Sequence, residues 1–110
     1  MPSTLELSPT EFCIRWPEDK RDSVTLLDVR EAPEISIASI PGTLKIPMME
    51  IPSRLHELNH DMTVVVMCHS GGRSRRILEF LLASGFNRVF NLTGGIDAWS
   101  QEIDSSIPRY

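Results

Sequence analysis

The chain has 110 residues, which is enough for one domain that buries a single core without disulfides or a structural metal. Its 11 lysines and arginines against 15 aspartates and glutamates give a formal charge of −4, so nothing indicates a nucleic-acid surface or a membrane-binding face. It has no apolar run of transmembrane length and no signal-peptide pattern at its start, and two cysteines do not make a disulfide framework. We therefore expect a cytoplasmic protein in a reducing compartment.

Strand and helix patterns alternate along the chain. In chain order, we expect a short helix at 9–15 opened by a capping box, a strand at 24–29, a loop with a helical turn at 32–43, a short strand at 44–46, a helix near 51–58, a strand ending at Met67, a helix at 74–84, a strand at 89–92 and a final helix near 95–101. This alternation predicts an α/β fold with a central parallel sheet of about five strands and helices on both faces. No repeat or linker interrupts it, so residues 1–110 are expected to form a single domain.

The strand that ends at Met67 is followed directly by a cysteine, which begins a loop. Its uninterrupted run of Thr, Val and Met is typical of a strand buried on both faces of a parallel sheet, and Cys68 follows at its carboxyl end. The loop ends where the predicted helix at 74–84 begins. Backbone N–H groups and the positive end of the helix dipole would favour the Cys68 thiolate and hold an anion there.

Two glycines and an arginine complete this loop. Gly71 and Gly72 let the backbone turn so that successive N–H groups converge, and Arg73 adds a guanidinium that could stabilise the thiolate or hold an oxyanion with forked hydrogen bonds. The alternative is a buried structural cysteine followed by an ordinary glycine turn. Cysteine, two glycines and arginine in one loop favour a functional site.

The spacing indicates which chemistry the loop supports. Cysteine phosphatases place five residues between cysteine and arginine, whereas four separate Cys68 from Arg73 here. A tighter ring has room for one extra sulfur atom on Cys68 rather than for a phosphoryl group. The spacing therefore opposes a cysteine phosphatase or an arsenate reductase.

The loop from Cys68 to Ser74 resembles the active-site loop of the rhodanese family of sulfurtransferases, whose common bacterial form reads Cys-Arg-Ser-Gly-Gly-Arg-Ser. Only His69 departs from that form. Three further segments resemble motifs of the family in the family's order: residues 26–31, residues 40–43 with 46–47, and residues 91–99. The matches cover about residues 24–100, and the tail at 107–110 weakly resembles rhodanese domains fused to enzymes that activate sulfur-carrier proteins.

The resemblance implies a thiosulfate or persulfide sulfurtransferase that works through a persulfide on Cys68, with no metal or organic cofactor. The donor would be thiosulfate, a small-molecule persulfide or a protein persulfide. The acceptor would be cyanide, a thiol or a sulfur carrier. A cysteine desulfurase or a sulfur-carrier protein is a candidate partner. The alternative is a non-catalytic rhodanese-like interaction or regulatory module. The residues expected to bind the substrate or the persulfide are His69, Ser70, Gly71, Gly72, Arg73 and Ser74.

Asp28 and Arg30 resemble the family's Asp-x-Arg, where the acidic residue helps to organise the surroundings of the active loop. The alternative is an Asp that caps a turn and an Arg paired with Glu31 or Glu34, so we list both only as supporting residues. His69 stands where a second arginine is common in the family. Since an imidazole lacks a permanent charge, we expect a raised Michaelis constant for thiosulfate.

The remaining candidate residues carry weaker signals. Cys13 lies in a helical pattern and is expected to be a small core residue, and Trp99 is expected to pack in the core. Arg75 and Arg76 form either a docking surface or a solvated helix face. His56 and His60 lack a ligand pattern, so no metal site is expected.

Overall fold

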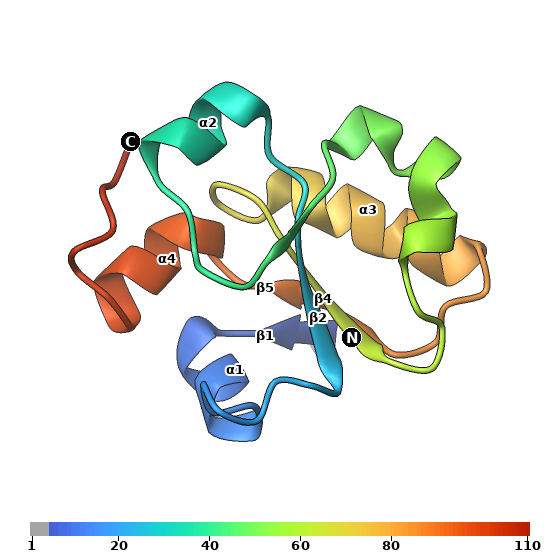
Figure 1. Ribbon diagram of the computed structural model, residues 1–110, viewed down its shortest axis with the longest axis horizontal. Coiled ribbons are helices and arrows are strands. Elements are labelled where there is room, and N and C mark those ends of the chain that lie inside the picture. The colour runs from blue at the N-terminus through green and yellow to red at the C-terminus, as the bar shows by residue number, and fades with distance from the viewer. Residues whose placement is uncertain (1–4) are drawn as a thin grey trace.

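The computed structural model describes residues 5–110 and contains one parallel sheet of five strands. The strands run in the spatial order β1-β5-β4-β2-β3, with β4 at the centre (Figure 1). Their bounds are β1 Glu6–Leu7, β2 Val24–Asp28, β3 Leu44–Lys45, β4 Thr63–Met67 and β5 Val89–Leu92. The predicted α/β class and parallel sheet are confirmed, while the two-residue edge strand β1 was not predicted.

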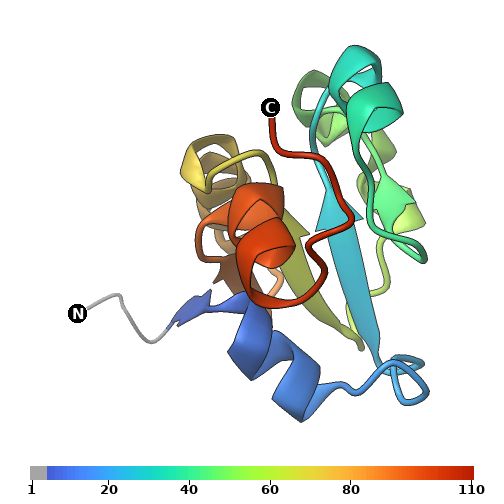
Figure 2. The same ribbon diagram turned by 90° about the vertical axis from the view of Figure 1, so that its left-hand side faces the viewer.

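Helices cover both faces of the sheet, as expected. The α-helices are α1 Pro9–Arg15, α2 Ala32–Ile37, α3 Gly72–Ala83 and α4 Gly95–Glu102, and two 3₁₀ helices are η2 Met48–Glu50 and η3 Pro52–Glu57. The helix α3 packs on one face together with η2 and η3, whereas α1 and α4 pack on the other and face the viewer in Figure 2. No helix within residues 5–110 is both long and apolar enough to cross a membrane.

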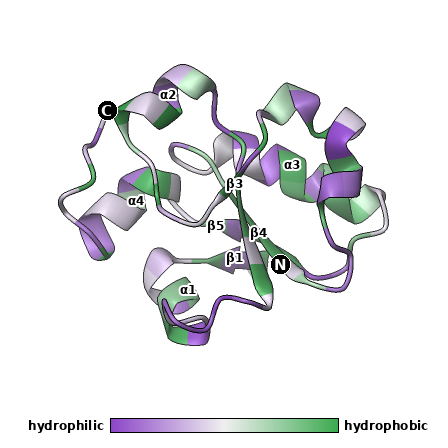
Figure 3. Cartoon of the chain, viewed as in Figure 1, coloured by the Kyte–Doolittle hydropathy of each residue, from purple (hydrophilic) through white to green (hydrophobic). Residues whose placement is uncertain are grey.

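The side chains of β4 alternate between these two layers. Val64 and Val66 pack with α3, and Val65 and Met67 pack with α1 and α4. All four are fully buried, and β4 is hydrophobic along its length in Figure 3. Cys68 continues the alternation on the α3 side, so the strand fixes the direction in which the thiol leaves the sheet.

Three elements differ from the sequence prediction. The helix α3 begins at Gly72 rather than Ser74. Gly71 has φ = 113°, and this turn of the backbone allows the helix to begin at the next residue. The segment at 32–43, predicted as a loop with a helical turn, contains the six-residue helix α2, and Pro33 fits in its first turn because a proline there needs no hydrogen-bond partner. The segment near 51–58 is 3₁₀ rather than α-helical and is kinked at Arg54.

Candidate active site

The sulfur of Cys68 lies at the carboxyl end of β4 and is surrounded by hydrogen-bond donors. The backbone N–H groups of Gly71 and Ser74 donate to Sγ at 3.1 and 3.4 Å, and the Ser74 hydroxyl lies 3.3 Å from it. Both N–H groups belong to the start of α3, where no intrahelical acceptor exists for them. The residue is 1% exposed, so these donors act in a site with little water.

These donors decide the ionisation of the thiol. Burial alone raises the pKa of Cys68, but hydrogen bonds from the side chain and backbone of Ser74 and from the backbone of Gly71 and Ser70 outweigh it and bring the pKa below its ordinary value. The thiolate is the nucleophilic form of cysteine. The loop therefore favours the reactive form of a buried sulfur.

The first turn of α4 holds the start of the loop through two backbone hydrogen bonds. The N–H groups of Ile96 and Asp97 donate to the carbonyl oxygens of Cys68 and His69 at 2.9 and 3.1 Å. Gly95 has φ = 59°, and a Cβ there would collide with both carbonyls. The glycine thus permits the close approach that pins the start of the loop.

Arg73 does not direct its guanidinium to the sulfur. It makes a two-pronged ion pair with Glu34 on α2, with N–O distances of 2.7 and 2.8 Å. The hydrogen bonds from Arg73 are the main reason that the pKa of Glu34 falls to about 2, so this carboxylate is ionised at neutral pH. The forked donors expected to hold an oxyanion are occupied by a side chain of the protein.

Tyr110 joins the supporting residues to the loop. Its hydroxyl accepts from Arg30 at 3.0 Å and donates to Glu34 at 2.9 Å, and burial raises its pKa so that the proton is retained. Arg30 is in turn held by Asp28 through a fully buried ion pair of 2.7 Å. Figures 1 and 2 show the C-terminal segment rising from α4 to α2, which brings this tyrosine to Glu34. Arg30 also donates directly to the backbone carbonyl of Glu34 at 3.3 Å, so Asp28 and Arg30 are linked to Arg73 through Glu34, both directly and by way of Tyr110.

His69 and Ser70 occupy the first part of the loop. The His69 ring stacks on Tyr110 with centroids 4.1 Å apart and planes inclined by 17°. Its Nε2 atom is buried and has no hydrogen-bond partner within residues 5–110. Ser70 contributes its backbone N–H to the sulfur, and Gly72 is exposed at the first position of α3. Of the loop residues named from the sequence, Ser70, Gly71 and Ser74 thus meet the Cys68 sulfur, whereas Arg73 faces Glu34.

A second chain of polar contacts runs from Ser74 to the sheet edge. The Ser74 hydroxyl lies 2.5 Å from Oδ1 of Asn91, whose Nδ2 lies 3.2 Å from the Gly71 carbonyl and from Glu6. Glu6 also pairs with Arg75 at 2.7 Å. Of the two arginines that follow the loop, Arg75 is therefore engaged within the protein, while Arg76 is exposed.

Comparison with known proteins gives the family. A family model described as a rhodanese-like domain matches residues 15–102. The chain belongs to the rhodanese-like domain family. It is 42% identical over 80 residues to a protein named sulfurtransferase from Allochromatium vinosum, a match that covers 73% of this chain and 75% of the relative. It also aligns with the crystal structure of a rhodanese-like domain protein from Staphylococcus aureus, with a TM-score of 0.79 and 30% sequence identity. The alignment covers 96% of this chain and 97% of the other.

Two other relatives are longer than this chain. It is 42% identical over 93 residues to rhodanese-like/PpiC domain-containing protein 12 from Arabidopsis thaliana, which covers 81% of this chain but 31% of the relative. It is 38% identical over 86 residues to a putative sulfur carrier protein, YrkF, from Bacillus subtilis, covering 78% of this chain and 46% of the relative. Much of these two relatives thus lies outside the region that aligns.

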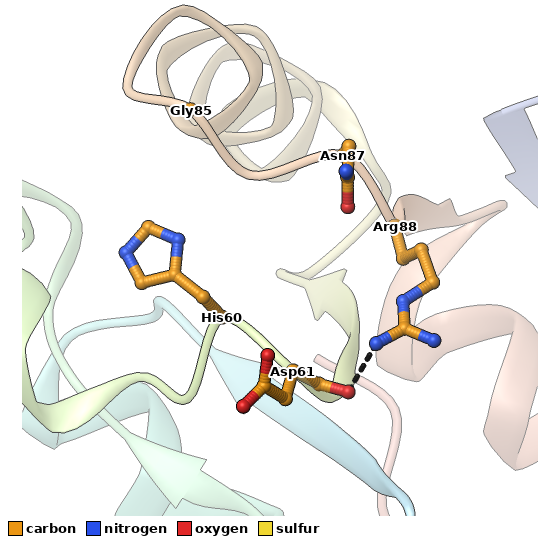
Figure 4. Close-up of a pocket in the computed structure, with 5 residues that line it drawn as sticks. All are labelled: His60, Asp61, Gly85, Asn87 and Arg88. Atoms are coloured by element: carbon orange, nitrogen blue, oxygen red, sulfur yellow. Dashed lines mark hydrogen bonds between the residues drawn. The ribbon is translucent and has the colours of Figure 1, made fainter.

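A hollow lies away from the rhodanese-like loop. It has a volume of about 610 Å³ and is lined by residues before β4 and β5, at the ends of these strands opposite Cys68: His60, Asp61, Gly85, Asn87 and Arg88 (Figure 4). Arg88 donates to the backbone carbonyl of Asp61, and the His60 ring stacks on Phe86. No cysteine lines this hollow, so it offers no thiol for sulfur transfer.

The other residues named from the sequence have structural surroundings. Trp99 is 4% exposed and packs in the core beside α1, as expected. Cys13 is half-buried at the edge of the same core and accepts a hydrogen bond from Arg21. Within the described residues, no three His, Cys, Asp or Glu side chains gather as a metal site would require.

Sequence reasoning missed the partners of the loop. Glu34 and Tyr110 are 39 and 37 residues from Arg73 along the chain, so no local pattern relates them. Asn91 was noted only as the start of a rhodanese-like motif, and Glu6 carried no signal at all. An acidic residue four positions after Arg30 hinted at an ion pair, but Glu34 pairs through its carboxylate with Arg73 instead.

Proposed function

We propose that this protein is a sulfurtransferase that carries a sulfane sulfur as a persulfide on Cys68. The observation that supports this most directly is the set of donors at the start of α3 that meet the Cys68 sulfur. Membership of the rhodanese-like family and a relative named sulfurtransferase point to the same chemistry.

In the first step, the Cys68 thiolate attacks the outer sulfur of the donor. A new S–S bond forms from the thiolate's electron pair, and the S–S bond of the donor breaks with its electrons on the leaving group, which is sulfite from thiosulfate or a thiolate from a persulfide. The N–H groups of Gly71 and Ser74 stabilise the thiolate beforehand. Burial limits competing reactions with water.

In the second step, an acceptor attacks the terminal sulfur of the persulfide. Cyanide would leave as thiocyanate and a thiolate would leave as a new persulfide, and in both cases the Cys68 thiolate is regenerated. No residue needs to be oxidised or reduced overall, so the cycle requires no organic cofactor or metal. A cytoplasmic persulfide donor, such as a cysteine desulfurase, and a sulfur-carrier protein as acceptor belong to the same proposal.

Intact-protein mass spectrometry tests the covalent intermediate. The reduced protein is mixed with thiosulfate or with a desulfurase and cysteine, and we expect a gain of one sulfur, about 32 Da, that is lost on adding cyanide. Cys68→Ser should show no gain, whereas Cys13→Ser, which removes the other cysteine, should behave as the wild type. Absence of the adduct with both donors would contradict the proposal and favour a non-catalytic rhodanese-like module.

A further inference from the structure

Three arginines around the loop are paired with carboxylates, whereas Arg76 is exposed. Each pair joins an arginine near the site to an acid on another element: Arg73 to Glu34, Arg75 to Glu6 and Arg109 to Asp97, with N–O distances of 2.7, 2.7 and 2.8 Å. Arg73 is the arginine of the loop itself, and both prongs of its guanidinium are used. At Arg73, a donor that reaches Cys68 therefore meets a compensated charge rather than a free cation.

Glu34 is fixed in place from three directions. One carboxylate oxygen accepts the N–H of Glu31 at 3.1 Å, the other accepts the Tyr110 hydroxyl at 2.9 Å, and Arg73 binds both. The side chain of Glu34 is 21% exposed, so little water screens it. An incoming anion cannot displace this carboxylate without breaking contacts to α2 and to the C-terminal segment.

We propose that Glu34 is a specificity-determining residue that makes the Cys68 loop select singly charged sulfane-sulfur donors over the doubly charged thiosulfate. This inference rests on the proposed sulfur transfer and deepens it. Repulsion between the fixed carboxylate and a donor grows in proportion to the charge of the donor. The dianion therefore loses more binding free energy than a monoanion of similar size.

Methanethiosulfonate is a suitable matched donor. It replaces one anionic oxygen of thiosulfate with a methyl group, carries a single charge and presents the same kind of outer sulfur. The Cys68 thiolate would take that sulfur, and methanesulfinate would leave with the electrons of the broken S–S bond. Because the two donors differ in intrinsic reactivity, the informative quantity is how a substitution changes the ratio of their kcat/KM values.

The decisive variant is Glu34→Gln, assayed with cyanide as acceptor. Removing the carboxylate charge should raise kcat/KM for thiosulfate by about tenfold and for methanethiosulfonate by about threefold, since the repulsion scales with donor charge. Both changes should appear mainly in KM. Glutamine is also accepted at the third position of a capping box and still offers Arg73 an oxygen, so α2 is expected to stay folded.

Two further variants separate charge from position. Glu57→Gln removes the same charge from an ion pair with Arg54 on η3. We expect its ratio of kcat/KM values for the two donors to equal that of the wild type. Tyr110→Phe removes a hydrogen bond to Glu34 but leaves its charge, so the ratio should also stay close to that of the wild type. A ratio that moved as far in Tyr110→Phe as in Glu34→Gln would overturn the charge argument.

Other outcomes are equally clear. If Glu34→Gln lowers kcat/KM equally for both donors, Glu34 only positions Arg73 and the inference is wrong. An unchanged ratio in Glu34→Gln also overturns it, even when both donors load sulfur onto Cys68. Failure of both donors to load Cys68 in the wild type, seen by intact mass, would instead contradict the proposed function on which the inference rests.

Discussion

The hydroxyl oxygen of Ser74 lies 2.5 Å from Oδ1 of Asn91, closer than the 3.3 Å that separates it from the sulfur of Cys68. Asn91 is oriented by its Nδ2, whose neighbours, the Gly71 carbonyl and the Glu6 carboxylate, can only accept. The single hydroxyl proton is therefore directed to Asn91 while the backbone N–H groups serve the sulfur. A thiolate is a stronger acceptor than a thiol, so ionisation of Cys68 draws this proton toward the sulfur.

Ser74→Ala should consequently weaken the thiolate. We expect the pKa of Cys68 to rise and its alkylation by iodoacetamide at pH 7 to slow by about three- to tenfold, because one hydrogen bond to the charged form is lost. The measurement is the pH profile of alkylation in a Cys13→Ser background. Ser84→Ala, which removes a hydroxyl bonded to Phe80 at the end of α3, is the matched control. A profile identical to the control would show that the hydroxyl does not reach the sulfur.

Gly95→Ala should displace the start of the loop that carries Cys68. A Cβ at this position would collide with the Cys68 and His69 carbonyls, and φ = 59° is unfavourable for alanine. We expect a loss of at least about 2 kcal/mol in the free energy of unfolding and loss of sulfur loading on Cys68. Urea denaturation and intact mass measure the two effects.

Gly42→Ala provides the comparison for that variant. Gly42 also has a positive φ, 82°, but no atom lies within 4 Å of the Cβ that alanine would add. It should cost about 1 kcal/mol for backbone strain alone and leave sulfur loading intact. Equal behaviour of the two variants would mean that the contact between α4 and the loop is unimportant.

The sequence was informative wherever a local pattern encodes the structure. The capping box at Ser8 predicted the start of α1, and the apolar run before Cys68 predicted the central strand β4. The loop glycines predicted the turn between β4 and α3, although not the early start of α3, which depends on the positive φ at Gly71. These features are set by neighbours in sequence, so propensity and spacing capture them.

The parts that were missed depend on distant pairings. The strand β1 has two residues, too few for a periodic pattern, and exists because Leu7 pairs with Leu92 on β5. Arg73 was expected to face the sulfur, and its pairing with Glu34 depends on where α2 lies beside the loop. The role of Tyr110 likewise requires the C-terminal segment to return to α2. Only the folded arrangement brings these residues together.

Asp28→Ala should destabilise the fold more than any exposed charge substitution. Asp28 and Arg30 are both 0% exposed, and removing the carboxylate leaves a buried guanidinium without its counterion. We expect a loss of about 3–5 kcal/mol in the free energy of unfolding. Arg54→Ala, which breaks two solvent-accessible ion pairs, with Glu50 and Glu57, should have little effect. Urea denaturation of the two variants checks this, and similar midpoints would contradict the assigned burial.

The ion pair between Glu34 and Arg73 predicts a specific acid sensitivity. The pKa of Glu34 falls from an ordinary 4.5 to about 2 in the folded protein, mainly through hydrogen bonds from Arg73. A depressed pKa contributes stability above pH 4.5, and this contribution is lost as pH falls from 4.5 toward 2. Urea denaturation between pH 6 and pH 2.5 should therefore show wild type losing stability more steeply than Glu34→Gln, with the two curves converging at the acidic end. Parallel curves would show that Glu34 titrates normally, and that Arg73 remains free to receive an anionic donor.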